Sequence, residues 1–544
     1  MPGLDLRSIY SYDNTTVKDH IYYSANHYKG SADNGNVNEY RTTYEKMVTS
    51  TTANYTGTFD KHTVGTMVGF EAEKNKTDYV RATGSNLAVS TIHTVSTAGT
   101  QTSAGYSWGN SMVSVLSKLD YNYDERYFIS GSYRRDGSSR LSKQERWGNF
   151  WSLGASWRVD RESFMASTSD WLSALTLKMS YGAQGNDNLG TYYASKGLYS
   201  IVSNLGENAL VSDRMATPNL KWETNLNFNV GIDFSLFNNR FSGSFDFFTR
   251  RSKDLLYSRP IAPSLGYGSI DENVGALKNT GIEMVLNGTI INQNGWVWKL
   301  GMNLTHYKNK VTDLPLKDMP RSGVNKLQVG RSVYDFYMIE WAGVDPENGD
   351  PLWYMDEKDA NGKVTGRTVT EDYTQASKYE LGSTLPDFQG GFSTDFAYKG
   401  IDLSIATNFQ IGGKIYDSMY SSFMHAGSNI GSNWHKDILN AWTPENKNTN
   451  VPIMDGAQNS NSQSSRFLIN ASFFNIRNIS LGYTFPKEWM KAISASSARI
   501  YVSADNVALF SKRKGMDPRQ YAYGYSAANY SAIRTLSFGI NLNF

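Results

Sequence analysis

A two-residue alternation of apolar and small polar side chains, repeated in segments of about ten residues, constrains this chain more than any other feature. In residues 225–237 the apolar residues fall at every second position, and Asn, Asp, Ser or Gly stands between them. Successive side chains of a β-strand point to opposite faces, so such a segment has one apolar face and one polar face. The pattern recurs at 241–251, 281–291, 296–307, 388–398 and 401–411.

The connections between these segments alternate between short and long. Turns of a few residues join the segments into hairpins, for example at Lys399–Gly400. Long connections rich in Gly, Asn, Asp, Ser and Tyr occupy about 252–280, 308–386 and 412–472. Structureless loops of this length argue against a compact globular domain. They are typical of an outer-membrane barrel, which has short periplasmic turns and long extracellular loops.

The composition supports strands and excludes several other classes of protein. No apolar run reaches the ~18 to 20 residues that a membrane-spanning helix needs, so residence in a membrane requires a closed β-barrel. The chain has 35 Tyr, 25 Phe, 13 Trp and no Cys, which suits a protein that crosses an oxidising periplasm and excludes thiolate metal sites. A net charge of +2 without a basic block gives no basis for nucleic-acid binding.

We therefore predict an all-β chain that forms an antiparallel transmembrane β-barrel, with about 14 to 16 strands in the sequence. Strands in the first half are expected at 112–124, 126–136, 150–160 and 175–183, whereas 90–111 is expected to be a mobile loop. A secreted β-sandwich or propeller is the alternative. Its outer strand faces would usually be charged, whereas the polar face here consists of Asn, Ser, Gly and Thr.

Several segments resemble motifs of one family, the SusC/RagA-type TonB-dependent outer-membrane transporters of Bacteroidota. GAQGNDNLGTYY (182–193), TPNLKWET (217–224) and LKNTGIEM (277–284) resemble three of its motifs in the family's order. Four further segments continue that order to the C-terminus. They are GVDPENGDPLWYMD (343–356), LPDFQGGF (385–392), FFNIRNISLGYTFP (473–486) and ARIYVSADNVALFSKRKGMDPR (498–519).

The resemblance implies that residues 1–544 are the C-terminal part of a barrel of about 22 strands, with no plug domain or signal peptide visible. It implies a bacterial outer-membrane importer of oligosaccharides or peptides, not an enzyme. Expected partners are outer-membrane lipid, a SusD-like surface lipoprotein at the outer mouth, and the TonB complex, contacted through the missing N-terminal part. A passive porin without a plug and a secreted β-rich adhesin are the competing functions.

The candidate ligand-binding residues are aromatic residues of the long loops, because aromatic rings stack on sugars and peptides. The alternative reading is ordinary loop packing or an interfacial aromatic girdle. The candidates are Trp341, Trp353, Tyr354, Tyr416, Trp434 and Trp442.

No metal site or cofactor is predicted. The seven His residues lack the spacing of a metal or hydrolase motif. The stretch Asp345–Asp350 lacks the pattern of a calcium loop and is predicted to be a turn.

The C-terminal strand predicts a second functional feature. From Leu536 onward the apolar residues again alternate, and the chain ends on Phe544. By resemblance, a terminal aromatic on such a strand is a signal for the barrel-assembly machinery. Phe538, Leu542 and Phe544 are the residues expected to carry it.

Overall fold

The structure, a computed structural model, describes residues 3–315, 318–320, 323–429, 431–456, 459–491, 494–521 and 524–544. Small parts of the predicted loops 308–386 and 412–472 therefore lie outside the described residues. Strands dominate what is described, and the two α-helices there are short, α1 (Ser418–Phe423) and α2 (Lys487–Lys491). Within these ranges, no helix has the length and apolar character needed to cross a bilayer.

Sixteen strands of the described residues follow one another in a single sheet, in the order β1-β2-β3-β4-β5-β6-β7-β10-β11-β14-β15-β23-β24-β27-β28-β29. The strand pairs with a defined register are antiparallel, which confirms the predicted fold class. The strands are β1 (Leu4–Tyr23), β2 (Asn36–Phe59), β3 (His62–Leu87), β4 (Ala98–Tyr123), β5 (Tyr127–Ser138), β6 (Trp147–Arg158), β7 (Leu172–Asn186), β10 (Glu223–Leu236), β11 (Phe241–Lys253), β14 (Ala276–Gln293), β15 (Trp296–Asp313), β23 (Phe388–Tyr398), β24 (Ile401–Ile411), β27 (Phe473–Thr484), β28 (Ser497–Ser511) and β29 (Thr535–Asn543).

The chain divides into two compact units. Unit 1 comprises Met1–Trp157, Met179–Phe228 and Arg251–Gly275, and unit 2 comprises the remaining residues. Unit 1 also contains two small hairpins, β8 (Leu198–Asn204) with β9 (Glu207–Arg214), and β12 (Leu256–Pro260) with β13 (Ser269–Asn273).

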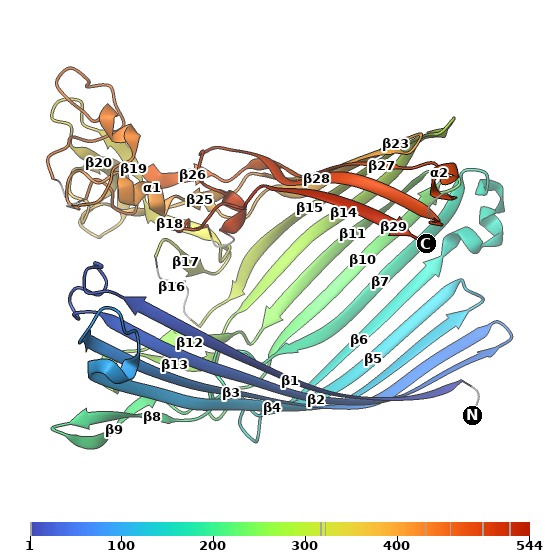
Figure 1. The fold of residues 1–544 in the computed structure, drawn as a ribbon, viewed down its shortest axis with the longest axis horizontal. Helices are drawn as coiled ribbons and strands as arrows, with labels where there is room; N and C mark the ends of the chain where they lie inside the picture. Colours follow the sequence, from blue (N-terminus) through green and yellow to red (C-terminus); the bar gives the residue numbers. More distant parts are fainter. Residues whose placement is uncertain are drawn as a thin grey trace. The chain divides into compact units, whose positions relative to one another are not determined.

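Strands β1 to β4 of unit 1 are 20 to 26 residues long and run side by side (Figure 1). A tilted strand needs only about 9 to 11 residues to cross a bilayer, so these strands continue well beyond it. The prediction of a mobile loop at 90–111 is wrong for residues 98–111, which form the first half of β4 and pair with β3. Their Thr, Ser and Gly residues lack an apolar alternation because this part of the strand needs no lipid-facing side.

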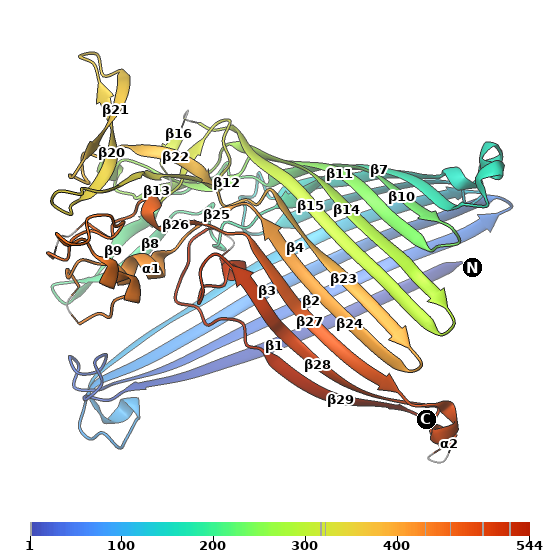
Figure 2. The same cartoon turned by 90° about the horizontal axis from the view of Figure 1, so that it is seen from above.

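In unit 2, the predicted hairpins are β14 with β15 and β23 with β24, and they lie side by side with β27 and β28 (Figure 2). The turn between β23 and β24 is tight, since Lys399 and Gly400 have φ angles of 45° and 89°. Two irregularities were not predicted: the register between β14 and β15 shifts between Ala276 and Leu277 and again between Thr289 and Ile291.

The long connections of unit 2 fold into small sheets at one end of its long strands (Figure 2). We call residues 323–383 and 412–472, as far as they are described, the loop module. Its strands are β17 (Lys326–Gln328), which pairs with β16 (Asp318–Pro320), then β18 (Asp335–Ile339), β19 (Trp341–Val344), β20 (Pro351–Lys358), β21 (Val364–Thr370), β22 (Lys378–Ser383), β25 (Lys414–Tyr416) and β26 (Leu468–Asn470). A buried core holds the module together, with Phe336, Met338, Tyr416 and Phe467 at its centre.

Candidate functional site

The long strands of unit 2 present one continuous apolar face. Directly opposed residues of an antiparallel pair share a face. Val502 of β28 lies between Leu481 of β27 and Phe538 of β29, and all three side chains are exposed to the surroundings of the protein. On the same face, a shallow hollow of about 470 Å³ is lined by residues including Leu300 and Phe392. This face can be stable only against lipid or another apolar partner.

The opposite face of the same strands is polar. Ser503 of β28 opposes Ser480 of β27 and Ser537 of β29. Arg499 donates through Nε to Asp402 at 2.9 Å. For β27, β28 and β29, these pairings confirm the predicted division of a strand into an apolar and a polar face.

Unit 1 has a polar face of the same kind. The Arg134 guanidinium donates to Glu71 at 2.9 Å, to Asp136 at 2.6 Å and to Ser114 at 2.8 Å, so one side chain bridges three strands. Charges of both signs are thus held in fixed positions along this face. Such a surface suits the wall of a water-filled passage, because paired charges of this kind are compatible with hydrated surroundings.

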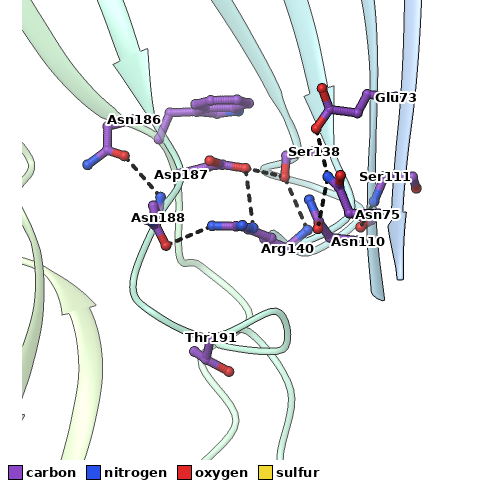
Figure 3. Close-up of polar contacts among 12 residues, drawn as sticks. Glu73, Asn75, Asn110, Ser111, Ser138, Arg140, Asn186, Asp187, Asn188 and Thr191 are labelled. Atoms are coloured by element: carbon purple, nitrogen blue, oxygen red, sulfur yellow. Dashed lines mark hydrogen bonds and ion pairs between the residues drawn. The ribbon is translucent and has the colours of Figure 1, made fainter. Parts of the chain in front are cut away.

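The family-like segment 182–193 anchors a loop to the polar face of unit 1 (Figure 3). The Asp187 carboxylate accepts a hydrogen bond from Ser138 Oγ at 2.6 Å, and Asn188 Oδ1 accepts one from Arg140 Nη1 at 2.8 Å. Asn186 Oδ1 in turn accepts from the backbone N–H of Asn188. The polar residues of this motif therefore fix the end of β7 to the end of β5.

The second family-like segment, 217–224, packs against β6, beside the first segment. The Trp222 ring meets Phe150 edge to face, with 5.2 Å between the ring centroids, and Trp222 Nε1 donates to the Arg146 carbonyl at 2.9 Å. A side chain at Gly185 would place its Cβ only 2.0 Å from the Phe150 ring. Only glycine fits at position 185, and this steric limit explains why the motif has glycine there. The two motifs thus build one structural contact in unit 1.

All six predicted ligand-binding aromatics belong to the loop module, and three of them are buried in it. Trp353 and Tyr416 are each 1% exposed, and Trp442 is 8% exposed. The Trp442 ring covers Gly349, and its Nε1 donates to the Pro346 carbonyl at 3.1 Å. Burial also raises the pKa of the Tyr416 hydroxyl, which therefore stays neutral. The rings of these three residues are occupied by packing, which leaves little ring surface for a ligand.

The other three predicted aromatics keep accessible surface. Trp434 is 48% exposed and stacks on His425, with 5.0 Å between the ring centroids. The Tyr354 ring lies 3.9 Å from the guanidinium carbon of Arg367, and the Trp341 ring lies 5.0 Å from that of Arg466. Nothing in the residue pattern singles out these two arginines, since neither is near its aromatic partner along the chain.

The predicted turn Asp345–Asp350 is confirmed. The backbone N–H of Asp345 donates to the Asp350 carbonyl at 2.9 Å, and Gly349 takes a φ of 83°. Across the described ranges, no group of three or more His, Asp or Glu side chains is placed to hold a metal ion.

The C-terminal strand has the predicted alternation. Phe538 and Leu542 lie on the apolar face of β29, opposite Val502 and Ala498 of β28. Phe538 is 74% exposed and Phe544 is 83% exposed, so neither packs into a protein core. In the described part of the chain, β28 is the only strand that pairs with β29.

Comparison with known proteins identifies relatives along nearly the whole chain. A family described as "TonB dependent receptor-like, beta-barrel" matches residues 3–507. The TonB-dependent receptor P3 of Formosa agariphila is 27% identical over 93% of this chain and 53% of its own length. The TonB-dependent receptor SusC of Bacteroides thetaiotaomicron is 28% identical over 81% of this chain and 44% of its own length.

A solved structure of the RagAB peptide transporter resembles the fold over 100% of this chain and 60% of the solved chain, with a TM-score of 0.89 and 28% identity. The chain spans about half the length of the curated relatives that it matches.

Proposed function

This chain belongs to the TonB-dependent receptor-like β-barrel family, in its SusC/RagA-type branch, whose members are proteins of the bacterial outer membrane, and from this premise we propose that it supplies the barrel wall and outer loops of an active importer. The imported ligand is an oligosaccharide or a peptide. The similarity to the RagAB peptide transporter over the full chain is the observation that carries the proposal most strongly.

The two faces of the sheet support this function physically. An exposed apolar face stabilises the strands in lipid, and the opposite face carries paired charges such as Arg499–Asp402 and Arg134–Glu71. A polar wall lets a hydrated ligand pass without desolvation. By family analogy, a plug supplied by a further part of the protein would close the passage until the TonB complex acts on it.

The loop module is the part of the chain best suited to meet partners outside the membrane. Its buried aromatics give it a core, so the module can hold a fixed surface above long strands. We assign to this surface the docking of a SusD-like lipoprotein. Trp341, Tyr354 and Trp434 are the ligand-contact candidates, because each retains exposed ring surface.

The proposed assembly role of Phe538, Leu542 and Phe544 follows from their position. They form part of an exposed apolar row on the last strand, and recognition of that row requires no prior folding of the loops. The barrel-assembly machinery is the partner proposed for this row.

Uptake measured in the host bacterium tests the proposed function. A strain that lacks this gene should lose growth on one class of oligosaccharide or peptide and should regain it when the gene is restored. Collapse of the inner-membrane proton gradient should stop uptake of that ligand across the outer membrane. Uptake is measured at early times, before consumption of the ligand in the cytoplasm limits the rate. A passive porin would keep its outer-membrane flux under that treatment, and a secreted adhesin would show no ligand-specific growth defect.

A further inference from the structure

Arg466 has an unusual setting in the loop module. It lies in the 3₁₀ turn Ser465–Phe467, next to the fully buried Phe467. Its guanidinium carbon lies 5.0 Å from the centre of the Trp341 ring and 5.1 Å from that of Phe467. Arg466 Nη1 donates to the Ser460 carbonyl at 2.6 Å. The cation is therefore held by two aromatic rings and one neutral acceptor.

Other arginines of unit 2 that stack on aromatic rings have a carboxylate partner. Arg367 lies over Tyr354 and donates to Glu340 at 2.7 Å. Arg513 lies over Tyr420 and pairs with Asp417. For Arg466, by contrast, no carboxylate oxygen of the described residues lies within 4.0 Å of its nitrogen atoms. Arg466 is thus a cation whose counter-charge is missing.

The pKa values of two of these arginines reflect this difference. Burial lowers the pKa of the Arg466 guanidinium to about 10. Burial also acts to lower the pKa of Arg367, but the hydrogen bond and charge attraction of Glu340, together with contributions from Tyr379, outweigh burial, and the pKa is raised. A cation–π contact and a neutral hydrogen bond recover only part of the hydration that a buried cation loses. The Arg466 site would therefore gain stability from an anion.

The remaining N–H groups of Arg466 are available to such an anion. They have no hydrogen-bond partner among the described residues, and they are not among the fully buried polar atoms that lack one, so each retains some accessible surface. The planar guanidinium presents donors in a fork that matches the two oxygens of a carboxylate. The two rings fix the plane of that fork and so reduce the entropy lost on binding.

We propose that Arg466 binds a carboxylate group of the transported ligand, which makes that ligand an acidic oligosaccharide or an acidic peptide. The inference rests on the proposed import function and narrows its substrate class. Both sources share the carboxylate, and Trp341 beside Arg466 adds an aromatic surface on which either ligand can pack. Arg466 acts here as a binding residue, and no chemical step is involved.

Equilibrium binding to the native protein, extracted from outer membranes in detergent, tests the inference with four probes. Tri-galacturonate is compared with its methyl ester, and tetra-glutamate with tetra-glutamine, by calorimetry. One acidic probe should bind, its neutral counterpart should bind at least about 10-fold more weakly, and Arg466→Gln should lose a similar factor. Arg367→Gln is the matched control. It should retain the affinity for the acidic probe, because the Arg367 guanidinium is already paired with Glu340.

Two results would overturn the inference: equal affinity for the acidic and the neutral probe, or no binding of either acidic probe. The comparison of probes on the unaltered protein holds even if Arg466→Gln fails to fold, and Arg466→Lys adds a variant that keeps the charge but loses the fork. Binding in detergent needs no TonB complex. Gradient-dependent uptake without preference for acidic probes would therefore refute only this inference, whereas acid binding without gradient-dependent uptake would refute the transport function.

Discussion

The division of the sheet into two faces predicts opposite outcomes for the same substitution at two adjacent residues of β27. Ile479 lies on the apolar face between Ile405 and Ala504, and Ser480 lies on the polar face between Ser404 and Ser503. Ile479→Arg should strongly destabilise the protein in a bilayer. Ser480→Arg should cost little.

The position of Ile479 along β27 sets the magnitude. Tyr483, four residues further along β27, is the last residue of the apolar face at the turn end, the level at which aromatic side chains usually meet the interface. With a rise of about 3.3 Å per residue and a strand tilt of about 40°, Ile479 lies about 10 Å deeper. In an apolar band about 25 Å tall this is near the midplane, where arginine costs ~2–4 kcal/mol.

The polar face offers an added arginine a different environment. Ser404, opposite Ser480, donates to Asp395 at 2.6 Å, so a carboxylate lies close to the substituted position. The guanidinium introduced by Ser480→Arg would remain hydrated or pair with that group. We expect a change in the free energy of unfolding within about 0.5 kcal/mol, as for an ordinary surface substitution.

Reversible urea unfolding from short-chain lipid vesicles, followed by tryptophan fluorescence, measures both costs. Ile479→Arg should lower the folding equilibrium constant by about 30- to 700-fold relative to the parent protein. Ile479→Gln separates the loss of apolar surface from the cost of the charge. Equal destabilisation by Ile479→Arg and Ser480→Arg would refute the assignment of faces.

Three further predictions concern the loops and the C-terminus. Trp222→Ala should cost about 3–5 kcal/mol in the same unfolding assay, because it removes the ring packed on Phe150, and a cost below about 1 kcal/mol would contradict that packing. Burial and nearby carboxylates raise the pKa of Asp350, so its charged form destabilises the folded loop at pH 7. Asp350→Asn should therefore slow amide hydrogen exchange of that turn at pH 7. It should have no such effect well below pH 3.8, where the Asp350 carboxyl is as neutral as the amide that replaces it. Slower exchange of the variant that persists in acid would contradict the charge of Asp350 as the cause. Deletion of Phe544 should lower the fraction of protein assembled in the outer membrane, measured by heat-dependent gel mobility, whereas Phe544→Tyr should preserve it; equal assembly of the two would exclude a terminal aromatic signal.

The sequence predicted the unit 2 hairpins well because lipid-facing strands carry a strict two-residue pattern. Residue types alone were enough to predict the turn at Lys399–Gly400 and the pairing of 281–291 with 296–307. The first half of β4, residues 98–111, was missed for the converse reason. Most of its residues are Thr, Ser or Gly and most are exposed, so no apolar alternation marks the strand.

The loop module could be predicted only in part. Aromatic residues such as Trp353 and Trp434 look alike in the sequence, yet one is buried and the other is half exposed. Trp353 is packed between Trp341 and Tyr373. Trp434 instead stacks on a histidine ring. Other contacts of the module join segments far apart along the chain, as between Trp341 and Arg466. No local periodicity encodes such contacts. The absence of a counter-ion at Arg466 likewise becomes visible only when all of its neighbours are known.

The central claim, that each long strand separates lipid from a polar passage, can be tested directly on β28. The chain contains no cysteine, so single cysteines at positions 498–505 can each carry a spin label without background. Collision with oxygen, which concentrates in lipid, and with a water-soluble nickel chelate then reports the environment of each label. Labels at Ala498, Ile500, Val502 and Ala504 should favour oxygen, and those at the intervening positions should favour the chelate. Equal accessibility to both reagents along the strand would contradict the account.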